Sequence, residues 1–306
     1  MSCLKPIRIE NPKRPLSASD PTFLVVPCGK CPGCRIDSRK ELSLRVLLES
    51  KLYPYNIFFT LTYDEINEPW RDYSDDADSP YLAPCFSKRD VQLFIKRLRK
   101  RLFGNGKSKI RYFIASEYGP KSFRPHYHCI VWNFPEWPIS KVHSVLQECW
   151  NLGHVGGVGI LNDGGCAYCC KYLLKRQPDE FAILDPNFSL RSRRPAIGYG
   201  FFEERPHLVN WLRESRRKDF ALTQDRFFSL PRLFASKIFD DEMLSDISEK
   251  NQAAYIDKIN TKFNRLVNVL GSPAEACDLL RRENEARWLA LNRSIHKTLK
   301  KSKEHE

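Results

Sequence analysis

The sequence predicts an α+β fold in which an antiparallel β-sheet is covered by helices. Between residues 57 and 176, runs rich in β-branched and aromatic residues alternate with runs whose apolar residues recur at helical spacing. Hydrophobic residues make up 42% of the 306 residues, which is typical of a globular chain with a sizeable core. No repeat with a period of about 20–50 residues is visible, and this argues against a solenoid.

The chain begins without a regular pattern. Residues 1–27 hold several prolines, and three cysteines crowd into residues 28–34. A helix is expected at 37–52, where leucines share one face. Residues 57–63 (Ile-Phe-Phe-Thr-Leu-Thr-Tyr) are dense in β-branched and aromatic residues and are expected to form a buried strand.

An acidic stretch at 64–84 is expected to be a solvated loop. Ser87 can then cap a helix, because Asp90 falls in its first turn and apolar residues follow at helical spacing. Two strands are expected next, at 110–116 and 126–132, and a turn-rich connection joins them.

Three further elements complete this part of the chain. They are a helix at 140–150, a glycine-rich strand at 155–161 and a helix at 165–176. The resulting order is strand, helix, strand, strand, helix, strand, helix. This order is typical of a ferredoxin-like α+β unit, with an antiparallel sheet covered by helices.

Beyond residue 177 the chain is basic and is expected to be irregular as far as residue 237. Two helices are expected after it, at 241–270 and 273–300, because Gly271-Ser272-Pro273 interrupts the helical spacing. The whole chain is therefore expected to have three parts, which are a cysteine-rich segment with a helix (1–52), the sheet-bearing domain (53–178), and a basic segment followed by a helical C-terminal region (179–306).

Composition narrows the class of function. Lys and Arg total 50 against 37 Asp and Glu, a formal net charge of +13 at pH 7, which favours nucleic acid as a partner before a membrane surface. No apolar run approaches the ~20 residues of a membrane-spanning helix. The first residues contain no apolar stretch typical of a secretory signal. Eleven cysteines in such a chain indicate a reducing cytoplasm, with metal-bound or free thiols.

The sharpest chemical feature is His126-Tyr127-His128. Side chains alternate across a strand, so both imidazoles project from one face, about 6–7 Å apart at Cα. Glu117, on the preceding strand, would join them near the hairpin end if the two strands pair. Such a three-ligand site suits Mg²⁺ or Mn²⁺ acting on phosphates, and also Zn²⁺. The alternative is a hairpin with two ordinary polar histidines.

A second feature lies in the helix expected at 165–176. Tyr168 and Tyr172 are one turn apart there, with Lys171 beside them. A tyrosine hydroxyl can attack a phosphodiester in line and form a phosphotyrosyl linkage. Its unperturbed pKa is about 10, so the attack needs lysine charge or a metal ion that polarises the phosphate. The alternative is a helix with two half-buried tyrosines and solvated lysines.

Cys28, Cys31 and Cys34 form a C-x₂-C-x₂-C pattern, and Cys3 is available as a fourth thiolate. A tetrahedral Zn²⁺ site made by these four residues would pin the irregular N-terminus. An iron–sulfur cluster fits less well, because Ser38 occupies the position of the next ligand in the ferredoxin pattern. Free buried thiols are the remaining alternative.

These motifs resemble those of the HUH endonucleases, which include rolling-circle replication initiators and relaxases. His126-Tyr127-His128 is similar to their His-hydrophobic-His motif. Phe59-Thr60-Leu61-Thr62-Tyr63 is similar to their first motif, and Tyr168-Cys169-Cys170-Lys171-Tyr172 to their nucleophile motif. The order and the spacing of the motifs both fit.

A narrower resemblance is to the replication initiators of gokushovirus-type microviruses. It rests on three stretches, which are Pro27–Arg35, Phe94–Arg99 and Glu117–His128. The similarity runs from Cys3 to the region of Arg176, and residues 205–306 carry no motif of this kind.

The resemblance implies nicking of single-stranded DNA at a phage replication origin through a 5′-phosphotyrosyl intermediate, followed by strand transfer and religation in the bacterial host cytoplasm. A host helicase or polymerase is an expected partner. Carried over by position, it implies a catalytic Mg²⁺ or Mn²⁺ bound by His126, His128 and Glu117, nucleophiles at Tyr168 and Tyr172, and phosphate contact or assistance from Lys171.

Two other functions stay open from the residues alone. One is a non-enzymatic, zinc-stabilised nucleic-acid-binding protein, and the other is a metal-dependent phosphodiesterase without covalent catalysis. In each case a single strand could follow the basic residues, which concentrate at 96–111, 171–176 and 191–218.

Overall fold

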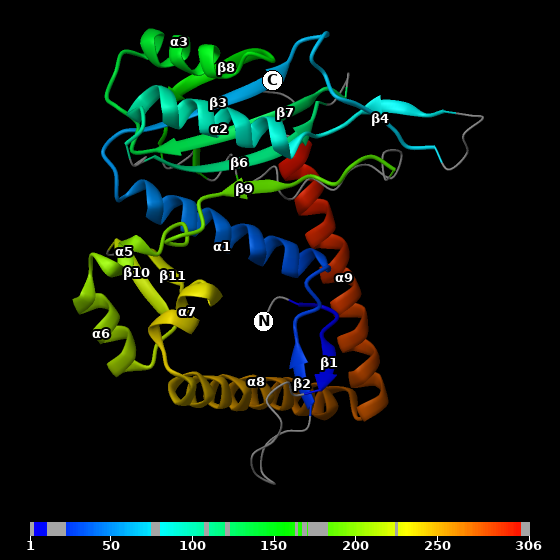
Figure 1. The fold of residues 1–306 in the computed structure, drawn as a ribbon. Helices are drawn as coiled ribbons and strands as arrows, with labels where there is room; N and C mark the ends of the chain where they lie inside the picture. Colours follow the sequence, from blue (N-terminus) through cyan, green and yellow to red (C-terminus); the bar gives the residue numbers. More distant parts are fainter. Residues whose placement is uncertain are drawn as a thin grey trace. The chain divides into compact units, whose positions relative to one another are not determined.

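Figure 1 shows a computed structural model of the 306-residue chain. It describes residues 3–10, 23–74, 80–106, 110–119, 123–162, 165–166, 170, 183–223 and 226–300. Through α3, the elements are β1 (Ile7–Glu10), β2 (Phe23–Val26), α1 (Pro32–Ser50), β3 (Asn56–Tyr63), β4 (Trp70–Asp72), β5 (Leu82–Pro84), α2 (Lys88–Phe103), β6 (Arg111–Tyr118), β7 (Pro125–Trp132) and α3 (Ile139–Cys149). They continue with β8 (Gly153–Ile160), β9 (Ser189–Arg191), α5 (Gly200–Glu203), α6 (Pro206–Ser215), β10 (Asp219–Thr223), β11 (Arg226–Ser229), α7 (Arg232–Ile238), α8 (Asp241–Leu270) and α9 (Pro273–Lys300).

The chain forms two compact units. One is Leu42–Arg205, and the other combines Met1–Glu41 with Pro206–Glu306. This grouping differs from the three consecutive parts expected from the sequence, because the two ends of the chain belong to one unit and β9 belongs to the other.

The Leu42–Arg205 unit is built on a five-stranded sheet with the strand order β8-β3-β7-β6-β9. Every neighbouring pair of strands in it is antiparallel. The helices α2 and α3 cover one face of this sheet (Figure 1). The prediction of an α+β fold with an antiparallel sheet and helices is therefore confirmed.

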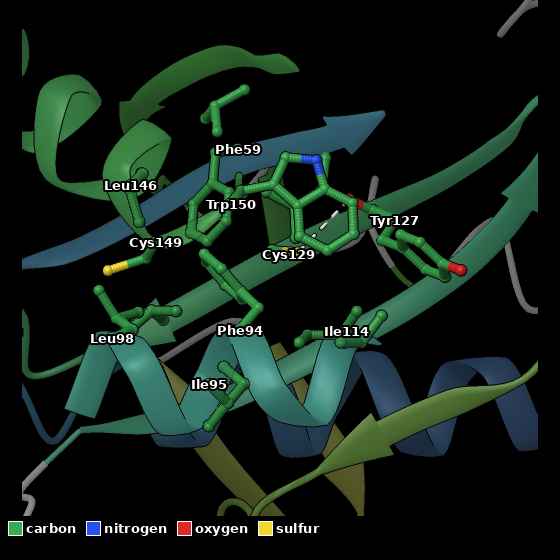
Figure 2. Close-up of a cluster of buried hydrophobic side chains, with 14 of the residues drawn as sticks. Phe59, Phe94, Ile95, Leu98, Ile114, Tyr127, Cys129, Leu146, Cys149 and Trp150 are labelled. Carbon is green, nitrogen blue, oxygen red and sulfur yellow. Dashed lines mark hydrogen bonds between the residues drawn. The ribbon is translucent and has the colours of Figure 1, made fainter. Parts of the chain in front are cut away.

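The face of the sheet under α2 and α3 holds the larger core. Figure 2 shows Phe94, Ile95 and Leu98 projecting from α2 toward the sheet. The ring centroid of Phe94 lies 5.9 Å from that of Phe59 and 6.0 Å from that of Trp150. The cap predicted at Ser87 is present, because its hydroxyl accepts a hydrogen bond of 3.2 Å from the Asp90 backbone N–H.

The opposite face carries a smaller apolar cluster at one end. Strand residues such as Phe113, Ile130 and Trp132 pack there with Leu42 and Val46 of α1. The Ser50 hydroxyl accepts a hydrogen bond of 2.8 Å from Trp132 Nε1 and donates one of 2.9 Å to the Val46 carbonyl. These contacts fix the C-terminal half of α1 against this end of the sheet.

Several short elements lie where the sequence predicted irregular chain. The stretch 1–27 contains the β1–β2 pair, and 64–84 contains the β4–β5 pair. Between 177 and 237 lie β9, α5, α6, β10, β11 and α7. Strands of three to five residues are too short to display a period, so pairing rather than pattern defines them. The helix expected from 37 starts at Pro32, a residue suited to the first helical position.

The two C-terminal helices match the prediction. The Asp240 side chain accepts a hydrogen bond of 2.8 Å from the Met243 N–H and caps α8, which ends at Gly271 in the left-handed region with φ 73°. Among the described helices, none combines the length and apolar character that crossing a membrane requires.

We expect Phe94→Ala to lower the free energy of unfolding by about 3–5 kcal/mol, because it empties a site enclosed by Phe59 and Trp150. The exposed Lys96 on the same helix supplies a control, and Lys96→Ala should change this energy by no more than about 0.5 kcal/mol. Urea denaturation followed by tryptophan fluorescence measures both variants. Equal effects would contradict the assignment of this core.

Candidate functional site

The register of three strands places the predicted metal ligands on one face of the sheet. On β7, His126 is the direct partner of Thr62 on β3 and of Glu117 on β6. His128, two residues along, is the direct partner of Thr60. Directly paired residues project from the same face, so the two imidazoles and the carboxylate share the face opposite α2 and α3.

His128 and Glu117 are in direct contact. The Nε2 atom of His128 lies 2.8 Å from Oε2 of Glu117, and both side chains are buried, at 6% and 2% exposure. Its Nδ1 atom lies 3.3 Å from the Thr60 hydroxyl oxygen. Two neighbouring ligand atoms at about 2.1 Å from one cation are about 3 Å apart, so this pair is spaced to share a divalent ion.

His126 lies on the next pair of rungs. Its Nδ1 atom is 2.8 Å from the Thr62 hydroxyl oxygen. With the proton on Nδ1 and donated to that oxygen, Nε2 presents its lone pair to a ligand. Burial, followed by the charges of His128 and Arg124, lowers the pKa of His126 to about 4. The imidazole is therefore neutral at pH 7, which is the form that binds metal ions.

The His126 ring lies against the end of the β6–β7 hairpin. A Cβ atom at Gly119 would be 2.8 Å from its Nε2 atom, so glycine at this position makes room for the ring. The Gly119 N–H donates a hydrogen bond of 3.0 Å to the Arg124 carbonyl and closes the described part of the hairpin. The structure thus brings Glu117 and His128 into contact and holds His126 beside them, turned toward Gly119.

Sequence reasoning did not assign roles to three neighbours of this site. Thr60 and Thr62 orient the two imidazoles through the hydrogen bonds above. His154, an exposed residue of β8, is the other direct partner of Thr62 and so faces the same side as His126. Two threonines at a spacing of two in a strand beside the histidine strand were the available signal.

The predicted nucleophile segment is described only at its edges. Tyr168, Lys171 and Tyr172 lie outside the described residues. Cys166 and Cys170, which flank Tyr168 in the sequence, are buried in the apolar cluster on the histidine-bearing face. Both described ends therefore pack on the side of the sheet that carries His126 and His128.

A second candidate site lies in the other unit, at Cys3, Cys28, Cys31 and Cys34. Their four Sγ atoms lie within 4.8 Å of one another. Among the described residues, no other group of three or more His, Cys, Asp or Glu side chains gathers its ligand atoms in this way. The Sγ atoms of Cys3 and Cys31 are 3.9 Å apart. Sulfurs at about 2.3 Å from a tetrahedral Zn²⁺ are about 3.8 Å apart, so this cluster can hold a metal ion.

Backbone amides support negative charge on these sulfurs. The N–H of Cys31 donates to Sγ of Cys28 at 3.3 Å, and the N–H of Cys34 donates to Sγ of Cys31 at 3.5 Å. Gly29 makes the turn between them with a left-handed φ of 74°. Burial raises the pKa of the Cys31 thiol, but hydrogen bonds outweigh it and lower that pKa to about 6. Thiolate, the form that binds metal, is favoured there.

Comparison with known proteins gives the family context of the sheet-bearing unit. Residues 56–177 match the family of replication-associated proteins of the ORF2 type. This match contains β3, β6, β7 and the predicted nucleophile segment. The resemblance inferred from the motifs is confirmed at this level.

Individual relatives agree. The chain is 33% identical over 206 residues to the replication-associated protein ORF2 of Spiroplasma virus 4, covering 58% of this chain and 61% of that protein. It is 33% identical over 202 residues to the replication-associated protein VP4 of Bdellovibrio phage phiMH2K, covering 58% of each. It is 26% identical over 166 residues to ORF4 of Chlamydia phage 1, a replication-associated protein, covering 49% of this chain and 38% of that protein. The chain therefore spans less than two thirds of these relatives. No solved structure matches it.

We expect Gly119→Ala to weaken Mn²⁺ binding by about tenfold or more, because the added methyl group pushes the His126 ring from its position. Gly156 is a matched control on the same sheet, since a Cβ atom there meets nothing within 4 Å. Isothermal titration calorimetry with Mn²⁺ measures both variants. If Gly119→Ala and Gly156→Ala bind Mn²⁺ as the unmodified chain does, His126 is not a ligand.

Proposed function

We propose that the protein is a metal-dependent tyrosine endonuclease and strand transferase that initiates rolling-circle DNA replication. The observation that carries this proposal is the contact between His128 and Glu117, with His126 beside it on the same face of the sheet. The replication-associated names of its relatives support a role in DNA replication.

The proposed reaction is a transesterification. The hydroxyl oxygen of Tyr168 or Tyr172 attacks a DNA phosphorus atom, the P–O3′ bond breaks, and a 5′-phosphotyrosyl bond and a free 3′ hydroxyl result. In the reverse sense, a 3′ hydroxyl attacks the phosphotyrosyl phosphorus and releases the tyrosine. Two tyrosines allow one to hold a DNA end while the other attacks, and Lys171 would contact the phosphate or assist the attacking hydroxyl.

Each described ligand has a defined part in this proposal. Glu117 and the Nε2 atoms of His126 and His128 would hold Mg²⁺ or Mn²⁺, which supplies polarisation of the phosphoryl oxygen. Thr62 and Thr60 keep the imidazoles oriented through Nδ1. His126 would complete the set by turning from Gly119 toward the other two side chains.

The topology supports assignment to a ferredoxin-like, HUH-type core. The strands β3, β6, β7 and β8 follow one another in the chain with α2 after the first and α3 after the third, and they lie in the order β8-β3-β7-β6. This is the split βαβ arrangement, in which the hairpin strand β7 lies between β3 and β6. The histidine motif thus falls on a central strand with neighbours on both sides.

The proposed substrate is single-stranded DNA at a phage replication origin, in the cytoplasm of a bacterial host. The net charge of +13 supports a polyanionic substrate. Host replication proteins, such as a helicase or a polymerase, are proposed partners of the cleaved strand.

The alternative is a non-enzymatic, zinc-stabilised nucleic-acid-binding protein. The cysteine cluster favours it, because the four sulfurs are gathered more closely than the three catalytic ligands. We infer that Cys3, Cys28, Cys31 and Cys34 hold a structural Zn²⁺ in either case, since their spacing and hydrogen bonds fit a tetrahedral ion.

We expect the protein to form a DNA adduct that survives denaturing electrophoresis when it is incubated with Mn²⁺ and single-stranded oligonucleotides tiled over the viral genome. The Tyr168→Phe/Tyr172→Phe double variant should form none, because it lacks the attacking hydroxyls. His126→Ala should lose cleavage and keep its affinity for DNA within about twofold, since it removes a ligand rather than a charged DNA contact.

The other outcomes separate the alternatives. Cleavage without an adduct would support a phosphodiesterase that makes no covalent intermediate. Binding without cleavage would support the zinc-stabilised binding protein. Loss of DNA binding together with cleavage in His126→Ala would remove His126 from the metal site.

We expect the purified protein to contain about one zinc ion per chain, and we expect Cys31→Ser to lose it, because one of four thiolates is gone. Cys277 is exposed and lies outside the cluster, so Cys277→Ser should keep the zinc. Inductively coupled plasma mass spectrometry gives the metal content. A zinc-free wild-type protein would return the cluster to plain thiols.

A further inference from the structure

A pocket of about 570 Å³ lies where α2, β6 and β9 meet. Five arginines line it, and no acidic side chain is present among the described residues of its lining. The arginines are Arg99, Arg111, Arg191, Arg193 and Arg194. Its volume is within the range of about 300–1,000 Å³ that is typical of small-ligand sites.

The pairing of β9 with β6 creates this pocket. Arg191 is the direct partner of Phe113. The Ser192 N–H donates to the Tyr112 carbonyl at 3.0 Å, and the Tyr112 N–H donates to the Ser192 hydroxyl at 3.1 Å. The guanidinium of Arg99, on α2, lies 5.5 Å from the centre of the Tyr112 ring. Two basic stretches that are distant in the sequence therefore meet at one edge of the sheet.

The arginines of the pocket are not equivalent. Arg111 pairs with the buried carboxylate of Glu49, and it donates to the Pro195 carbonyl at 2.7 Å, so it builds the wall of the pocket. The Nε atom of Arg99 is buried and has no hydrogen-bond acceptor among the described residues. Within the same described part of the chain, Arg191 and Arg193 have no carboxylate partner.

We propose that this arginine pocket binds backbone phosphates of the single-stranded DNA on which the Glu117–His128 site acts. The planar guanidinium group offers paired donors that match two phosphate oxygens. The proposal rests on the proposed function, because it takes the same DNA strand as the ligand.

The pocket is a second contact point and not part of the metal site. Six residues of β6 separate Arg111 in the pocket from Glu117, which corresponds to about 20 Å along an extended strand. A strand of DNA anchored at the pocket would therefore be held several nucleotides from the phosphate that is cut. Such an anchor would raise affinity for every sequence, since guanidinium contacts to phosphate carry no base information.

The test is the affinity for a fluorescein-labelled thymidine oligonucleotide, measured by fluorescence anisotropy without added divalent ions. We expect Arg191→Ala/Arg193→Ala to bind about tenfold more weakly, as expected for losing at least one charge-assisted hydrogen bond. Each lost phosphate contact should also reduce the slope of log K against log salt by about 0.7. The control Lys100→Ala/Arg101→Ala removes two charges from the exposed surface of α2 and should leave both quantities nearly unchanged.

An unchanged affinity in Arg191→Ala/Arg193→Ala would overturn the proposal, and so would an equal loss in the control. Deoxyadenosine triphosphate provides the competing source of phosphate. Its arginine-dependent binding with unaltered oligonucleotide affinity would make the pocket a nucleotide site and overturn the DNA assignment. Adduct formation by the unmodified protein tests the proposed function separately, since it does not depend on this result.

Discussion

The antiparallel register of β6, β7 and β3 is the constraint on which the candidate site depends. A slip of one residue would turn His126 and His128 into the core under α2 and expose Tyr127 in their place. The core prevents this slip. Tyr127 is fully buried, and its hydroxyl accepts a hydrogen bond of 2.9 Å from the Ser87 N–H at the start of α2. The apolar face of β7 therefore determines which way its polar face points.

The histidine-bearing face is itself divided along the strands. At one end Trp132 and Ile130 are buried by α1 and by Cys166 and Cys170. At the other end lie His128 and His126, with hydroxyl and carboxylate neighbours. One surface of the sheet thus combines a packed end that holds the flanks of the predicted nucleophile segment with a polar end that can bind an ion.

Periodicity made one part of this structure predictable from sequence. The helices α2 and α8 and the strand β3 have long apolar patterns, and Glu117 could be assigned because a hairpin fixes its own register. The arginine pocket could not be predicted, because β9 has three residues and pairs with a strand over 70 positions earlier. The roles of Thr60 and Thr62 depend on side-chain geometry across strands, which no pattern along one strand contains.

Burial of Glu117 also bears on function. A carboxylate with 2% exposure carries a desolvation cost, and a single imidazole partner offsets that cost less well than a divalent cation does. Apolar side chains at Glu117 and His128 would pack the same space without that cost, as Phe113 and Ile130 do farther along the same two strands. A fold selected for stability alone would extend the apolar cluster to this end. The buried polar pair is therefore better explained by the ion it can bind than by any contribution to folding.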